Sequence, residues 1–333
     1  MLDNFNFLLM KSNLTLLSVF TCIGLAAQNI QNNPQSNHGN KFEQLGTTLP
    51  TPNIYRTASG APGHGYWQSR ADYDIAAYLD EDKRNLKGSE TITYYNNSPD
   101  DLEYIWLQLD ENEHSSINNA DYGFSSTIPQ ITTEQNIRST ELPIKDNGYG
   151  VRLEKVTDLL GAPLTYTVNK TMMRIDLSKV LKKGEKFIFK VNWNYNIPER
   201  AITPGARGGY ENFPEDGNDL YTMAQWYPRM CVYNDFKGWQ NHQFAGVGEF
   251  ALAFGNFKVS INVPSDHLVG GTGECKNYEQ VLTPDQLERY KKAETSSEPV
   301  EIATLNEAKK AEKNHAKQRK TWIFEANDVR DFA

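Results

Sequence analysis

The chain has 333 residues, with 34 Lys and Arg against 42 Asp and Glu, which gives a formal net charge of −8. Nucleic-acid backbones require a basic protein surface, so a nucleic-acid partner is not expected. The 6 Trp, 17 Tyr and 15 Phe supply enough apolar surface for a large core, and the 3 Cys are too few to suggest a disulfide-stabilised scaffold.

Residues 1–27 have the pattern of a secretory signal peptide. Lys11 precedes an apolar run, Leu14–Ala27, that ends in small residues. The run is shorter than the roughly 20 residues that cross a bilayer, so no transmembrane span is expected. The sequence therefore predicts export to the periplasm, the cell surface or the medium. Cys22 leaves a lipid anchor open, because the residues before it match a lipobox poorly.

Residues 28–65 are rich in Asn, Gln, Pro, Gly and Thr and contain few large apolar side chains. Such a segment buries too little surface to offset the entropy cost of ordering it. We therefore expect a flexible linker or an arm lying on the surface, followed by one β domain over residues 66–333.

From Trp67 onward, apolar and polar residues alternate with a period of two, which is typical of half-buried strands. The predicted strands cover residues 71–79, 90–96, 102–109, 164–168, 172–177, 187–195, 257–263 and 322–326. They follow one another without a regular alternation of strand and helix. This order predicts a mainly β fold, a largely antiparallel, multi-stranded β-sandwich.

Residues 279–320 interrupt the strand pattern and predict a small helical insertion near the C-terminus. Thr283 and Pro284 form a helix start, with the helix expected to run to about Ala293. A second helix is expected from Thr304 to Gln318. The mixed charges of this region are typical of solvated helix faces.

Motifs for several kinds of catalysis are missing from the sequence. It contains no His-Glu-x-x-His, no Gly-x-Ser-x-Gly and no glycine-rich phosphate loop that opens a helix. A glycosidase would need two carboxylates about 5–10 Å apart, which a sequence with 42 acidic residues cannot identify. Cys231 and Cys275 carry no signature of a catalytic thiol, and a disulfide between them stays open.

An ordered series of segments in the second half points to a family. The segments are Ala224–Met230, Gly238-Trp239, Gly248-Glu249-Phe250, Phe254–Val259, Val263-Pro264, Gly273-Glu274 and Trp322–Ala333. The series resembles the amino-terminal domain of the zinc aminopeptidases related to aminopeptidase N, the gluzincin family. The resemblance covers about residues 67–333 and implies a saddle-like β domain that covers the active site of a peptide-cleaving hydrolase.

The resemblance also implies what this chain lacks. In the family, the segment that resembles Val329–Ala333 leads into a thermolysin-like catalytic domain, which binds one zinc ion through two His and a Glu. We therefore expect zinc in the parent enzyme and none bound by this chain, no catalytic residue here, and no activity of the chain alone. The expected partners are the missing catalytic domain and a peptide substrate.

The resemblance further implies that this domain lends one side chain to the pocket for the substrate's free α-amine. Gln225 is the preferred candidate, with Tyr227 and Glu211 as further candidates. A buried ammonium needs acceptors or a counter-charge, because its desolvation otherwise cancels binding. The opposite interpretation stays open: Trp226 and Tyr227 as core aromatics, with Gln225 on their exposed side.

Two further alternatives remain. Arg229 is expected to form a structural ion pair with Asp235 or Glu249. The domain could also be a non-catalytic β-sandwich binding module, for example one that binds carbohydrate. In that case Trp67, Tyr221, Trp226 and Trp239 would supply the stacking surfaces.

Overall fold

The computed structural model describes residues 52–116, 131, 133–134, 146–201, 203, 207–244, 251–313 and 315–333. The chain divides into two units, Met1–Tyr66 and Trp67–Ala333. The predicted signal peptide and most of the predicted linker lie outside the described residues. In the first unit, residues 52–66 form turns that include a β-bridge between Arg56 and Pro62.

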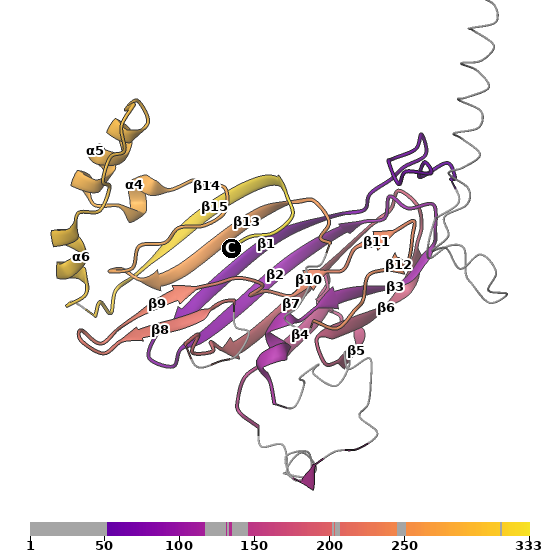
Figure 1. The fold of residues 1–333 in the computed structure, drawn as a ribbon, viewed down its shortest axis with the longest axis horizontal. Coiled ribbons are helices and arrows are strands. Elements are labelled where there is room, and N and C mark those ends of the chain that lie inside the picture. Colours follow the sequence, from indigo (N-terminus) through magenta and orange to yellow (C-terminus); the bar gives the residue numbers. More distant parts are fainter. Residues whose placement is uncertain are drawn as a thin grey trace, which may run out of the picture. The chain divides into compact units, whose positions relative to one another are not determined.

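The larger sheet of the second unit has seven strands in the order β14-β15-β13-β1-β2-β7-β4 (Figure 1). They are β1 (Arg70–Asp80), β2 (Asn85–Tyr95), β4 (Arg152–Asp158), β7 (Lys186–Asn196), β13 (Gly255–Pro264), β14 (Glu274–Cys275) and β15 (Arg319–Val329). Neighbouring strands pair antiparallel, except that β1 and β13 run parallel, with Tyr73 opposite Phe257.

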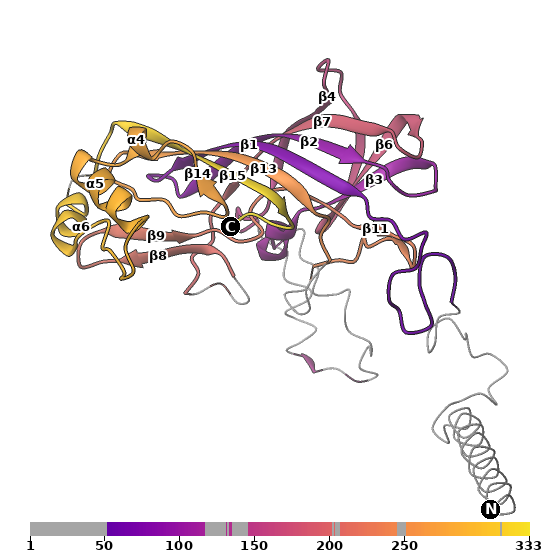
Figure 2. The same cartoon turned by 90° about the horizontal axis from the view of Figure 1, so that it is seen from above.

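A four-stranded sheet and two hairpins complete this unit. The four-stranded sheet has the order β10-β3-β6-β5. Its strands are β3 (Leu102–Gln108), β5 (Thr165–Asn169), β6 (Met172–Leu181) and β10 (Arg229–Met230). The hairpins are β8 (Gly209–Phe213) with β9 (Asn218–Thr222), and β11 (Tyr233–Asn234) with β12 (Gly238–Trp239). Figure 2 shows β8–β9 lying along one face of the larger sheet. The predicted fold class, mainly β with largely antiparallel sheets, is confirmed.

The core follows from the alternation read in the sequence. In β1 the apolar face, from Ala71 to Leu79, is buried at every second residue, and β7 buries Phe189 to Tyr195 in the same way. Trp193 lies across the pair from Gly88, where a Cβ atom would come within 2.1 Å of the indole ring. Glycine at position 88 therefore makes room for the largest side chain of the core.

The helical insertion is confirmed, although its second helix is shorter than predicted. It contains α4 (Tyr278–Val281), α5 (Pro284–Ala293) and α6 (Leu305–Ala311). Thr283 caps α5 with a complete capping box, as its sequence indicates. The prediction of a helix to Gln318 was wrong, because α6 ends at Ala311. Beyond it, the backbone N–H of Ala316 donates to the carboxylate of Asp266 at 2.5 Å instead of to a helix carbonyl. None of the helices in the described ranges has the length and hydropathy of a membrane span.

Candidate functional site

The segment between β9 and β10 carries Gln225 and is fixed at both sides by aromatic residues. Trp226 is 3% exposed, and its indole Nε1 donates to the Phe332 carbonyl oxygen at 2.9 Å. Tyr227 is 2% exposed and packs edge-on against Tyr73, with ring centroids 5.5 Å apart. The loop is therefore bound to the C-terminal residues of the chain, about a hundred positions away.

A buried ion network extends this attachment. Arg229 donates from Nε to Asp110 Oδ2 at 3.0 Å and from Nη1 to Asp331 Oδ2 at 2.6 Å, and Nη2 also bonds Asp110. Burial alone would lower the pKa of Arg229, but Asp110 and Asp331 outweigh it and hold that pKa above its usual range. The guanidinium thus joins three segments: η1 (Asp110–His114), β10 and the residues after β15.

Gln225 itself has an unusual backbone. Its φ is +60°, in the left-handed region that non-glycine residues rarely adopt. The residue is half-buried, and its side chain has no hydrogen-bond partner among the described residues. The strained backbone of Gln225 lies next to two buried aromatic residues, so the point at which its side chain leaves the backbone is fixed. The amide oxygen of that side chain is free to accept a hydrogen bond.

The other two candidate residues are already engaged. The Tyr227 hydroxyl donates to Asp331 Oδ1 at 2.7 Å, and burial raises the pKa of Tyr227 well above its usual range. Glu211, on β8, forms an ion pair with Arg200. No hydrogen bond or ion pair joins Gln225, Tyr227 and Glu211 within the described part of the chain. Of the three side chains, that of Gln225 is unengaged.

The structural ion pair expected for Arg229 is formed, but Asp235 is not its partner. The structure pairs Arg229 with Asp110 and Asp331 rather than Asp235, and Glu249 lies outside the described residues. Asp110 follows a buried strand and Asp331 follows the last one, so neither position is marked by spacing or motif. Sequence reasoning missed both residues because their proximity arises only from the packing of distant segments.

The aromatic residues considered for carbohydrate stacking are mostly covered. Trp226 and Trp239 are 3% and 9% exposed, so neither ring face is open to a sugar. Trp67 stacks on Tyr233 at 5.8 Å between centroids. Tyr221 lines a pocket beside the larger sheet. A glycan platform built on these four residues is therefore not formed.

Among the described residues, no group of three His, Cys, Asp or Glu side chains lies close enough to hold a metal ion. The described residues therefore do not form a three-ligand zinc site. Cys231 and Cys275 are both buried and free, which leaves the disulfide considered for them unformed in this structure.

Comparison with known proteins finds a likeness only among solved structures. No protein family matches the sequence, and no curated protein matches it. The M1 zinc metallopeptidase of Deinococcus radiodurans is 13% identical with a TM-score of 0.37, over 81% of this chain and 42% of that structure. A two-domain M1 zinc metallopeptidase variant bound to L-tryptophan is 13% identical with a TM-score of 0.36, over 80% of this chain and 41% of that structure.

The same enzyme of Deinococcus radiodurans, as a variant bound to a Tyr-Ser-Ala substrate, is 13% identical with a TM-score of 0.36, over 78% of this chain and 39% of that structure. The chain thus spans about two fifths of the length of these structures. A TM-score this low marks a distant likeness and carries no argument about function.

Proposed function

We propose that this chain is the amino-terminal, substrate-capping part of an exported zinc aminopeptidase, and that Gln225 accepts a hydrogen bond from the α-ammonium of the peptide. The ordered series of segments from Ala224 to Ala333 supports the family, and the pattern of residues 1–27 supports export. The zinc ligands and the hydrolytic residues belong, in this proposal, to a catalytic domain outside this chain.

One observation carries the proposal. Gln225 is the candidate whose side chain is unengaged among the described residues, and it sits at φ +60° beside Trp226, which is bonded to Phe332. A left-handed non-glycine residue costs about 1 kcal/mol or more and persists only where its surroundings fix it. Such a position fixes the point at which the acceptor side chain leaves the backbone.

The chemistry is that of an amide oxygen facing an ammonium group. A hydrogen bond to a charged group contributes about 1.5–3 kcal/mol, more than a neutral one. Loss of this bond should therefore weaken the use of free-amine substrates about ten- to a hundred-fold. A substrate with an acetylated amino terminus carries no ammonium and should be insensitive to the change.

The test uses the full-length gene product and an aminoacyl-p-nitroanilide. We expect Gln225→Ala to lower kcat/KM about ten-fold or more, mainly through KM, with an unchanged circular dichroism spectrum. Gln318→Ala, at an exposed position, is the matched control and should behave as wild type. Wild-type kinetics in the Gln225 variant would refute the assigned role. Absence of chelator-sensitive aminopeptidase activity in the full-length protein would refute the family.

A further inference from the structure

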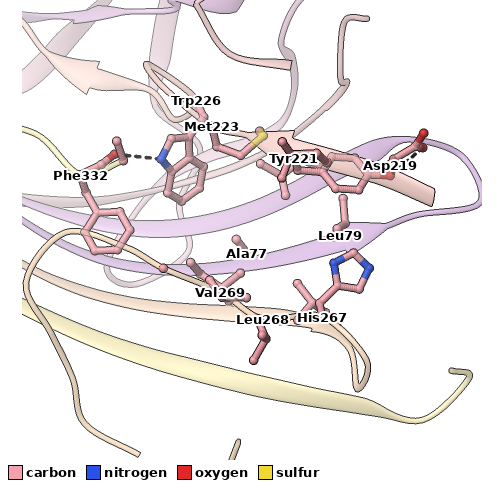
Figure 3. Close-up of a pocket in the computed structure, with 16 residues that line it drawn as sticks. Ala77, Leu79, Asp219, Tyr221, Met223, Trp226, His267, Leu268, Val269 and Phe332 are labelled. Carbon is pink, nitrogen blue, oxygen red and sulfur yellow. Dashed lines mark hydrogen bonds between the residues drawn. The ribbon is translucent and has the colours of Figure 1, made fainter. Parts of the chain in front are cut away.

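A pocket of about 200 Å³ lies between the β8–β9 hairpin and the larger sheet (Figure 3). Its floor includes Ala77 and Leu79 of β1, and Trp226 and Phe332 stand at one end. Met223 and Val269 face each other across its middle. This part of the pocket is apolar, and it is open to solvent at the surface, where uncovered apolar area is costly.

The other end of the pocket is polar. Asp219, Tyr221 and His267 lie there (Figure 3). The Tyr221 hydroxyl donates to Asp219 Oδ2 at 3.3 Å, and His267 Nε2 lies 3.3 Å from Glu81 Oε1. A few polar groups converging at one end of an apolar pocket are typical of small-ligand sites.

The polar end carries one ion pair and lies next to a second carboxylate. Arg84 donates from Nε to Asp219 Oδ2 at 2.7 Å and is the cation paired with that carboxylate. Burial alone would raise the pKa of Asp219, but Arg84 and Asn212 outweigh it, and the pKa lies below its usual range. Asp219 is thus an ion-paired carboxylate at this end, and Glu81, which contacts His267, places a second carboxylate next to it.

The volume limits what fits. An apolar protein cavity of about 150 Å³ holds one benzene molecule. A pocket of about 200 Å³ therefore holds a single ring with a short substituent, or an indole. A ligand of this size would replace water along Leu79, Met223 and Val269 while keeping its polar group at the open, acidic end.

We propose that this pocket binds a small aromatic amine, with its ring between Met223 and Val269 and its ammonium beside Asp219 and Tyr221. The proposal goes beyond peptide hydrolysis, because Gln225 is not among the lining residues and binding requires no catalytic domain. Its test therefore measures binding to this chain directly, and its failure is distinguishable from failure of the proposed function.

Isothermal titration calorimetry of the full chain with tryptamine, indole and indole-3-propionate separates the contributions of shape and charge. One tryptamine molecule should bind per chain, with a Kd of about 1 mM or lower. Its affinity should be at least ten-fold higher than that of indole-3-propionate, and the affinity of indole should lie between the two. No binding of any probe would show an unfilled packing gap and overturn the proposal. Equal binding of tryptamine and the propionate would overturn the assigned charge selectivity.

Variants locate the site. Val269→Trp fills the pocket and should abolish tryptamine binding, while Val168→Trp, at a half-exposed position of β5, is the matched control. Tyr221→Phe keeps the Arg84–Asp219 pair and should weaken tryptamine about three-fold or more without affecting indole. Wild-type tryptamine affinity in Val269→Trp would place the binding elsewhere and refute the proposal. Thermal unfolding confirms that each variant is folded.

Discussion

Glu90 lies in the middle of β2, with its side chain in the core and 1% of its surface exposed. Neither carboxyl oxygen has a hydrogen-bond partner of normal geometry among the described residues. Burial raises the pKa of Glu90 well above its usual range, and the neighbouring Trp193 indole opposes this shift only in part. The folded protein therefore carries Glu90 as a neutral acid over a pH range in which the unfolded chain ionises it.

The sign of the pH effect follows from this difference. Above a pH of about 4.5 the unfolded chain releases the proton and the folded chain keeps it, so rising pH favours unfolding. The free energy of unfolding then falls by about 1.4 kcal/mol per pH unit until the folded pKa is reached. Between pH 5 and pH 7 the loss from this group amounts to at most about 3 kcal/mol.

Glu90→Gln removes the titration while nearly preserving volume. The free energy of unfolding of this variant relative to wild type should rise between pH 5 and pH 7 by up to about 3 kcal/mol, measured by urea unfolding followed by circular dichroism. The slope is the test, because the introduced amide is also buried and its own cost is independent of pH. Burial also raises the pKa of Glu111, to about 8, but Glu111 is present in both proteins, so its contribution cancels in the difference between their free energies of unfolding.

The matched control is Glu103→Gln, at an exposed position of β3. Its free energy of unfolding should follow that of wild type at every pH. If the difference between Glu90→Gln and wild type stays constant from pH 5 to pH 7, the carboxyl group of Glu90 does not change its ionisation on folding and the reasoning is refuted.

Two further stability predictions concern charge and capping. Arg229→Ala leaves Asp110 buried without its cation and should cost about 3–5 kcal/mol in urea unfolding. Arg174→Ala removes an ion pair that is roughly half exposed and should cost less than about 1 kcal/mol; equal losses would contradict the role given to burial. Thr283→Ala removes the capping box of α5 and should cost about 1 kcal/mol, and no change would show that tertiary contacts alone hold the helix.

The long strands were predictable because the alternation of apolar and polar residues in each one reflects one buried and one exposed face. The alternation in Phe187–Tyr195 comes from a sheet with one buried face, and the structure has β7 there. The capping signal at Thr283 is equally local. Fold class and the positions of the long strands therefore followed from residues close together in the chain, whereas β4 and the hairpins β8–β9 and β11–β12 were not predicted.

The pairing of distant segments was not predictable in this way. Nothing in the sequences of β1 and β13 states that they run parallel, since either direction satisfies the same alternation. The partners of Arg229 were missed for the same reason. At the candidate site the type and place of Gln225 came from a resemblance, whereas its left-handed backbone and its free amide became visible only in the structure.

The position of β1 has a consequence for synthesis. β1 lies between β2, which follows it directly, and β13, which begins at Gly255. On the ribosome, β1 and β2 are made early. The second edge of β1 then stays unpaired until β13 is made, which begins about 160 residues after the end of β2 and takes on the order of ten seconds of translation. An unpaired strand edge of this kind invites association with other chains, so the nascent protein needs protection there until β13 has emerged.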